Sequence, residues 1–159
     1  MRRALQSLFL IGMLFWLIGC SKEKHPDFTL FKRAINKEKL AAMEGRYYRR
    51  SKPYSGAIFT VYSNGSLEME AILKNGLPDG LVIHWYESGQ KKKEAYYEQG
   101  RLEGIMTAWY ENGQKERTVT YENNTLNGLS ISWYPDGQRE SEVYYRNNRA
   151  ESVVRYEKR

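Results

Sequence analysis

The side chains that most often carry chemistry are few in this 159-residue sequence. There is one cysteine, Cys20, and there are two histidines, His25 and His84. One cysteine cannot form an intramolecular disulfide, and two histidines so far apart do not make a convincing metal site. Catalysis needs a nucleophile with a base, paired carboxylates in a cleft or a metal set, and the sequence shows none of these. We therefore expect a non-enzyme with no cofactor and no metal.

Cys20 ends a segment that has the layout of a secretory signal peptide. Arg2 and Arg3 precede an apolar run over residues 8–18. As a helix this run would span about 16 Å, well short of the roughly 30 Å hydrocarbon core of a membrane. The residues LIGC, which end at Cys20, resemble the bacterial lipobox, in which the thiol is acylated and the chain is cut before it. The sequence thus predicts a signal peptide over residues 1–19 and lipidation of Cys20; a buried core cysteine is the alternative.

Acylation of Cys20 would anchor the protein to a membrane, because each buried methylene contributes roughly 0.8 kcal/mol. Ser21 follows the cysteine. By resemblance to lipoproteins, a residue other than Asp at this position permits transfer to an outer membrane. We therefore expect an exported, membrane-anchored lipoprotein at the outer membrane or the cell surface.

Two segments lie between this anchor and the rest of the chain. Residues 20–27 are polar and include Pro26, which is typical of a flexible tether. In residues 28–45 the apolar positions recur at three- and four-residue steps and end before Gly45, which favours a short amphipathic helix with a glycine stop. We expect this helix to cover one end of the following domain; a helix on the membrane surface is the alternative.

Residues 46–159 form an array of repeats with a period of 24 residues. The period is read from the spacing of Trp85, Trp109 and Trp133, and the same step separates the turn glycines and tyrosines. Four units begin with a glycine, at Gly56, Gly80, Gly104 and Gly128. The first unit departs from the pattern, with Val61 where the others have tryptophan, and such atypical end units are typical of caps.

Each unit has the pattern of two strands joined by a tight turn. Pro135 at the first central position of the last such turn predicts a type I turn followed by a glycine at positive φ, a G1 bulge. A turn of this kind pairs Tyr110 with Gln114 and places Trp109 opposite Lys115. With regular pairing beyond it, Arg117 lies opposite Thr107 and Val119 lies opposite Ile105.

This regular pairing gathers tryptophans and cations on one face of the sheet. The candidate partner-binding residues on this predicted face are Trp85, Trp109, Trp133, Lys91, Lys93, Lys115, Arg117 and Arg139. The tryptophans are alternatively a core stripe of the array. A single-layer sheet cannot bury both faces, so part of this surface is expected to stay accessible or to meet a partner.

The segment WYENGQK at residues 109–115 resembles the MORN-repeat family in its bacterial form (MORN_2 variant), which includes proteins grouped as YwqK-type antitoxins. The resemblance covers residues 54–145. It implies an all-β fold, an elongated single-layer antiparallel meander of β-hairpin repeats, preceded here by a signal peptide and a short helix. The family label also implies an antitoxin-like role.

Three functions follow as hypotheses. The first is a lipid-anchored protein-interaction module of the cell envelope, the second an immunity protein that neutralises a toxin, and the third a binder of anionic lipid or glycan. Without Arg2 and Arg3 the chain has 23 basic and 19 acidic side chains, a balance too mild to indicate nucleic acid. The sequence leaves the partner and the oligomeric state undetermined.

Overall fold

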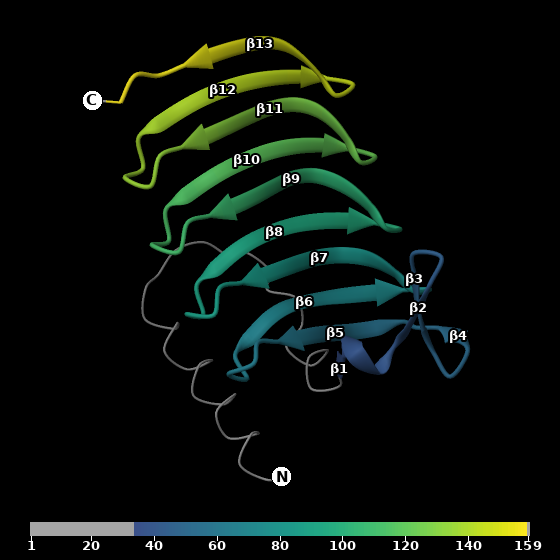
Figure 1. The fold of residues 1–159 in the computed structure, drawn as a ribbon. Helices are drawn as coiled ribbons and strands as arrows, with labels where there is room; N and C mark the ends of the chain where they lie inside the picture. The colour runs from purple at the N-terminus through teal and green to yellow at the C-terminus, as the bar shows by residue number, and fades with distance from the viewer. Residues whose placement is uncertain (1–33, 159) are drawn as a thin grey trace, which may run out of the picture.

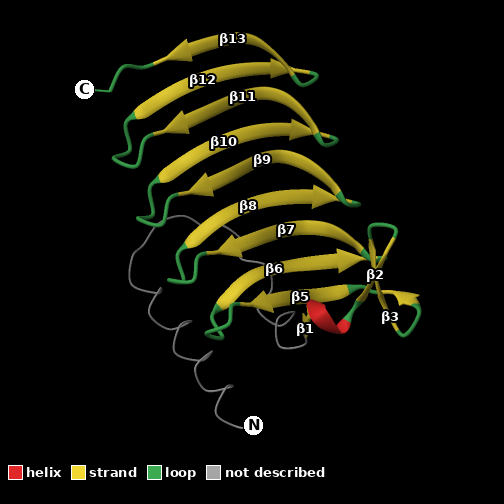
Figure 2. Ribbon diagram, viewed as in Figure 1, coloured by secondary structure: helices red, strands yellow, loops and turns green. Residues whose placement is uncertain are grey.

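The structure, a computed structural model, describes residues 34–158. The predicted signal peptide, the tether with Cys20 and residues 28–33 of the lead-in segment lie outside the described residues. Within the described part almost every residue belongs to a strand or to a turn between strands, with a single turn of 3₁₀ helix, η2 (Lys37–Lys39) (Figure 2). No helix in residues 34–158 has the length and apolar character needed to cross a membrane.

A ten-stranded sheet forms the body of the molecule, and its long antiparallel run of hairpins is the predicted meander (Figure 1). From β5 onward each strand pairs antiparallel with the next strand in the chain, and the two-residue strand β1 (Ile35–Asn36) adds to β5 in parallel. The nine antiparallel strands are β5 (Gly56–Val61), β6 (Leu67–Lys74), β7 (Leu77–Trp85), β8 (Lys91–Glu98), β9 (Arg101–Trp109), β10 (Lys115–Glu122), β11 (Thr125–Trp133), β12 (Arg139–Arg146) and β13 (Arg149–Arg155). The sheet is a single layer over most of its length (Figure 1).

A small three-stranded sheet lies at the β5 end of the long sheet (Figure 1). It consists of β2 (Ala41–Met43), β3 (Arg46–Arg49) and β4 (Lys52–Pro53). β3 and β4 lie within the segment predicted from residue 46 onward but belong to this small sheet, and the antiparallel run of the long sheet begins at Gly56, where the first repeat unit was predicted to start.

The amphipathic helix predicted over residues 28–45 is wrong in its described part. Residues 35–43 form β1, η2 and β2 instead. Gly45 does not end a helix: with Glu44 it forms a two-residue hairpin turn, at φ 50° and 74°, that pairs Met43 with Arg46. The apolar spacing serves tertiary contacts, since Leu40 packs on the core and Ile35 pairs with Ile58 of β5. The lead-in segment does cover one end of the array, but as short strands.

The turn at one end of each hairpin is the predicted one. In the third unit Tyr110 N–H donates to the Gln114 carbonyl at 2.9 Å, and Gly113 N–H donates to the Tyr110 carbonyl at 2.9 Å. Gly113 has φ 84°, as the G1 bulge requires. Asn112 supports the turn because its Oδ1 accepts the Gln114 N–H at 3.0 Å.

The pairing beyond the turn differs from the prediction. Lys115 does lie opposite Trp109, but the register shifts before Arg117, which pairs with Ala108 instead of Thr107. Val119 accordingly pairs with Met106 instead of Ile105. The same shift occurs in the three other hairpins. Because side chains alternate along a strand, the one-residue bulge moves the rest of the second strand to the opposite face.

We call the two faces of the long sheet the Trp face, which carries Trp85, Trp109 and Trp133, and the His face, which carries His84 on the adjacent position of β7. The strand pairings place the residues directly opposite His84, and those opposite them in turn, on the His face. This row consists of Met69, His84, Lys93, Ala108, Arg117, Ser132 and Ser141. The sheet thus presents two chemically different surfaces.

The hydrophobic core is on the His face of the first strands. Its buried members are Ile58, Met69, Ala71 and Leu73, and Leu40, Tyr47, Tyr54 and Val82 pack against them. Gly76 allows the small sheet to approach, because a Cβ at this residue would lie 2.7 Å from the Tyr47 carbonyl oxygen. Tyr47 N–H in turn donates to the Gly76 carbonyl at 2.8 Å.

Hydrogen bonds tie each unit to the next at both ends of the strands. At one end the tyrosine hydroxyls of Tyr62, Tyr86 and Tyr110 donate to the carbonyls of Trp85, Trp109 and Trp133 in the following unit. At the other end Asn124 and Asn148 use Oδ1 to accept the N–H groups of Leu102 and Leu126. These ties make the array one continuous body.

Candidate functional site

The eight predicted binding residues do not lie on a common face. The Trp face holds Trp85, Trp109, Trp133, Lys91, Lys115 and Arg139. Lys93 and Arg117 lie on the His face, where they pair with His84 and Ala108. The predicted grouping of the eight is therefore wrong, and its physical reason is the bulge between the first and third residues of each second strand.

The cations of the Trp face are already engaged within the molecule. Lys91 Nζ is 2.8 Å from Glu94 Oε2 and 5.2 Å from the centre of the Trp109 ring. One unit further along, Lys115 Nζ is 6.0 Å from the centre of the Trp133 ring. Each lysine thus lies over the tryptophan ring of the next unit, and the attraction between the ammonium group and the face of the ring stabilises this arrangement.

Arg139 occupies the corresponding position in the last unit, where it forms an ion pair with Glu142. The register shift places Glu142 and Glu94 on the Trp face, where they pair with Ile131 and Ile83. The Trp face therefore carries aromatic rings together with ion pairs between basic and acidic side chains, and it is not purely basic.

The tryptophans are half-buried, so they form neither a closed core nor a fully open platform. Around Trp85 the environment is partly desolvated. Burial raises the pKa of the Glu70 carboxyl, while Lys91 and the indole of Trp85 favour its ionised form. The Trp85 Nε1 atom is buried and has no hydrogen-bond partner within residues 34–158, so its effect on Glu70 is that of a nearby partial charge.

A row of apolar side chains on the Trp face is exposed and was not singled out from the sequence. Its members come from four strands, β8, β9, β11 and β12: Tyr96 (49% exposed), Ile105 (62%), Leu129 (43%) and Tyr144 (41%). Leu129 and Tyr144 are directly paired. Alternation along each strand places Ile105 and Leu129 on the face of the tryptophan four residues later, whereas the position of Tyr96 and Tyr144 depends on the register shift.

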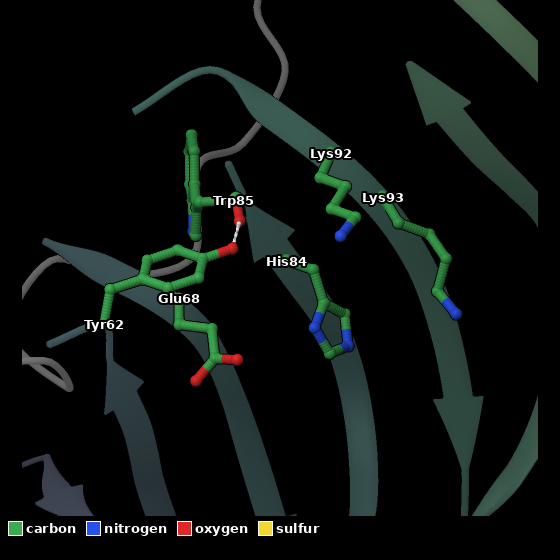
Figure 3. Close-up of a pocket in the computed structure, with 6 residues that line it drawn as sticks. All are labelled: Tyr62, Glu68, His84, Trp85, Lys92 and Lys93. Carbon is green, nitrogen blue, oxygen red and sulfur yellow. Dashed lines mark hydrogen bonds between the residues drawn. The ribbon is translucent and has the colours of Figure 1, made fainter. Parts of the chain in front are cut away.

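The His face is hollowed beside the first two turns. A hollow of about 160 Å³ is lined by Tyr62, Glu68, His84, Trp85, Lys92 and Lys93. Figure 3 shows His84 and Lys93 side by side on neighbouring strands, with Lys92 next to Lys93 and Glu68 on the other side of His84. The Tyr62 hydroxyl donates to the Trp85 carbonyl at 2.7 Å and closes one side.

His84 is half-buried and its environment opposes protonation. Burial lowers the pKa of the imidazole, and the positive charges of Lys93, Lys92 and Lys37 lower it further, against the opposing effect of Glu68. A second hollow of about 170 Å³ on the same face is bounded by His84, Lys37 and apolar core residues. The histidine thus lies between a charged hollow and an apolar one.

The remaining polar groups do not form a metal site in the part of the chain that the structure describes. Residues 34–158 contain no group of three or more His, Cys, Asp or Glu side chains close enough to hold an ion. Cys20 and His25 lie outside this part, and lipidation of Cys20 remains a prediction.

Comparison with known proteins supports the repeat. A search of curated proteins found no match. The MORN repeat variant matches the chain three times in succession, over residues 78–99, 102–123 and 126–147. The first predicted unit, from Gly56, is not among the matched segments, although β5 and β6 have the same hairpin geometry as the later pairs. The chain therefore resembles this repeat family in three consecutive segments between residues 78 and 147.

Proposed function

We propose that the protein is a lipid-anchored, non-enzymatic interaction module of the cell envelope that binds a protein partner through the Trp face. MORN repeats indicate a repeat-containing interaction module. The lipid anchor and the envelope location rest on the signal-peptide pattern and on Cys20.

The observation that carries the proposal is the exposed apolar row on the Trp face. Tyr96, Ile105, Leu129 and Tyr144 are each between 41% and 62% exposed on a rigid sheet. Exposed apolar groups rimmed by polar residues are a usual mark of a protein-binding surface.

The neighbouring charges suit a role in specificity. Lys91 and Arg139 already have carboxylate partners, so a protein that covers the face does not have to neutralise bare cations. Lys115 lies over Trp133 and is exposed, which leaves it able to contact a carboxylate at the rim. The Trp face thus offers apolar contact with a small number of directional polar groups.

The test is affinity capture from solubilised cell envelopes with the full chain as bait. The variant Ile105→Asp combined with Leu129→Asp places two charges in the apolar row and is expected to abolish capture of the main partner. The matched control is Arg117→Glu, an exposed change on the opposite face in the same unit, which should leave capture intact. Capture that survives the double variant would contradict the proposal, and a toxic enzyme as the captured protein would identify the module as an immunity protein.

A further inference from the structure

Two of the positions at which the second unit departs from the other three carry ionisable side chains. Where it has His84, the other units have Thr60, Ala108 and Ser132. Where it has Lys92, they have Glu68, Glu116 and Glu140, at the bulge of each second strand. The fold does not require either departure, because the other three units form the same hairpin without them.

Both departures line the same hollow on the His face (Figure 3). Lys92 replaces a carboxylate by an ammonium group there, and His84 adds an imidazole where the other units have small side chains. The two changes coincide in one hollow, one from an acidic to a basic group and one from a small side chain to an imidazole, and this indicates a local requirement that the remaining units do not share.

The donors of the hollow are available to a ligand. Lys93 is half-buried and forms no ion pair among residues 34–158. Lys92 lies 5.3 Å from the centre of the Tyr86 ring, a contact that leaves its N–H groups free to donate. The Tyr62 hydroxyl is not available, because it already donates to the Trp85 carbonyl.

The net charge of the residues that line the hollow favours an anion with a single negative charge. Among the residues that line this hollow, Lys92 and Lys93 contribute two positive charges and Glu68 one negative charge, and the imidazole of His84 is neutral at neutral pH; Lys37 belongs to the second hollow. The excess of one positive charge matches a carboxylate. A phosphate group carries about −1.5 to −2 at neutral pH and would leave unbalanced negative charge beside Glu68.

We infer that the hollow lined by His84, Lys92 and Lys93 is a binding site for a single carboxylate group, separate from the Trp face. Lys92 and Lys93 donate to the carboxylate oxygens and His84 supplies a third N–H. The carboxylate comes from an acidic side chain of a polypeptide or from a small free acid, and both present the same chemistry to the site.

Binding should be visible at His84 itself. A bound carboxylate offsets the positive charges of Lys93, Lys92 and Lys37, so the pKa of the imidazole rises when the site is filled. By linkage the affinity should increase as the pH is lowered through the pKa of His84. Glu68 is the acidic group that faces the imidazole, and it raises the pKa of His84 both with and without the ligand.

The test is a titration of the full chain in nonionic detergent, followed by the NMR signals of the imidazole rings. There are two histidines, and His84→Ala assigns the signals. The probes are a blocked peptide containing glutamate, the same peptide with glutamine, acetate and inorganic phosphate, all at constant ionic strength. We expect saturable shifts of the His84 signals with the glutamate peptide and with acetate, and none with the glutamine peptide.

The key variant, Lys92→Glu, introduces the residue that the other units carry and is therefore expected to fold. It should weaken carboxylate binding at least about tenfold. Arg149→Glu, the same change of charge on the far strand β13, should leave binding unchanged. Tighter binding of the peptide than of acetate would identify a polypeptide as the source, and equal binding a small acid. Undiminished binding by Lys92→Glu, or stronger binding of phosphate than of carboxylate, would overturn the inference.

Discussion

The two ends of the long sheet differ in what covers the His face. At the β5 end Ile58 and Leu73 are each 2% exposed, because the small sheet brings Leu40, Tyr47 and Tyr54 over them. At the other end Val153 of β13 is 54% exposed, although the pairings place it on the same face. The repeat alone therefore builds a sheet without a closed core, and the lead-in segment supplies the second layer.

The largest expected difference between the two ends is the cost of removing an apolar side chain. Leu73→Ala should lower the free energy of unfolding by about 2–5 kcal/mol, because it leaves a cavity under the small sheet. Leu129→Ala, the same change at a residue 43% exposed, should cost less than about 1 kcal/mol. Urea denaturation of both variants measures the difference. Equal losses would contradict the view that burial under the small sheet sets the cost at Leu73.

Glycine substitutions compare a turn that contacts the small sheet, at Gly76, with a turn in the uncovered part of the sheet, at Gly113, and the expected difference in stability is smaller. Gly76 and Gly113 have nearly the same positive φ, 80° and 84°, so alanine at either should cost about 1–3 kcal/mol through backbone strain. Gly76→Ala should cost more, because its Cβ would also press on the Tyr47 carbonyl, whereas Gly113 has only a side-chain atom at 3.9 Å. Thermal unfolding of both variants tests this order, and a reversed order would contradict the docking of the small sheet.

We call the hydrogen bonds from Tyr62, Tyr86 and Tyr110 to the next unit the tyrosine ladder. Removing one of these hydroxyls should lower the stability by a smaller amount, similar at each position. Tyr110→Phe removes a hydroxyl that donates to the Trp133 carbonyl at 2.9 Å and should cost about 1 kcal/mol. Tyr134→Phe is the matched control, since this tyrosine lies in the last hairpin, where Lys158 Nζ is 5.5 Å from its ring centre. Its loss of stability should be close to zero. A similar cost at both positions would show that the ladder does not join the units.

The smallest expected effect is a pH dependence located at the β5 end. Because the folded-state pKa of His84 lies below 6.5, the unfolded state binds more protons as the pH falls below this value, and stability decreases. Above 6.5 this contribution is constant. His84→Ala should remove part of the decrease in the urea midpoint between pH 7.5 and pH 5. Asp136 in the last turn acts in a lower range, since a backbone N–H from Gln138 lowers its pKa below 3.8.

The sequence predicted the repeat, the hairpins and the first turn of each unit, because glycine, proline and aromatic residues mark these positions. It predicted the G1 bulge of the turn but not the second bulge, which shifts the register between Lys115 and Arg117 and at the equivalent positions. Glu116 and its counterparts are ordinary charged residues, and both alternation patterns on the second strand, one with Val119 and one with Thr118, are compatible with a half-covered sheet. The error moved Lys93 and Arg117 to the wrong face.

The lead-in segment was mispredicted for a different reason. Its apolar spacing fits a helix locally, but the edge of β5 and the core beneath it offer hydrogen bonds and burial that a free helix lacks. The exposed apolar row and the hollow at His84 depend on which strands lie side by side. In the sequence His84 and Lys92 both differ from their equivalents in the other units, but that they line one hollow follows only from the register of the strands.

The hydrogen bonds from Tyr62, Tyr86 and Tyr110 to the next unit have a consequence for how such a protein can change in length. Every junction uses the same donor and the same acceptor, so duplication or deletion of one 24-residue segment would recreate a complete junction. Two strands at roughly 4.8 Å each would add or remove about 10 Å of sheet per event. The length of the array can therefore change in whole steps of one unit, while the covered end at β5 is left untouched.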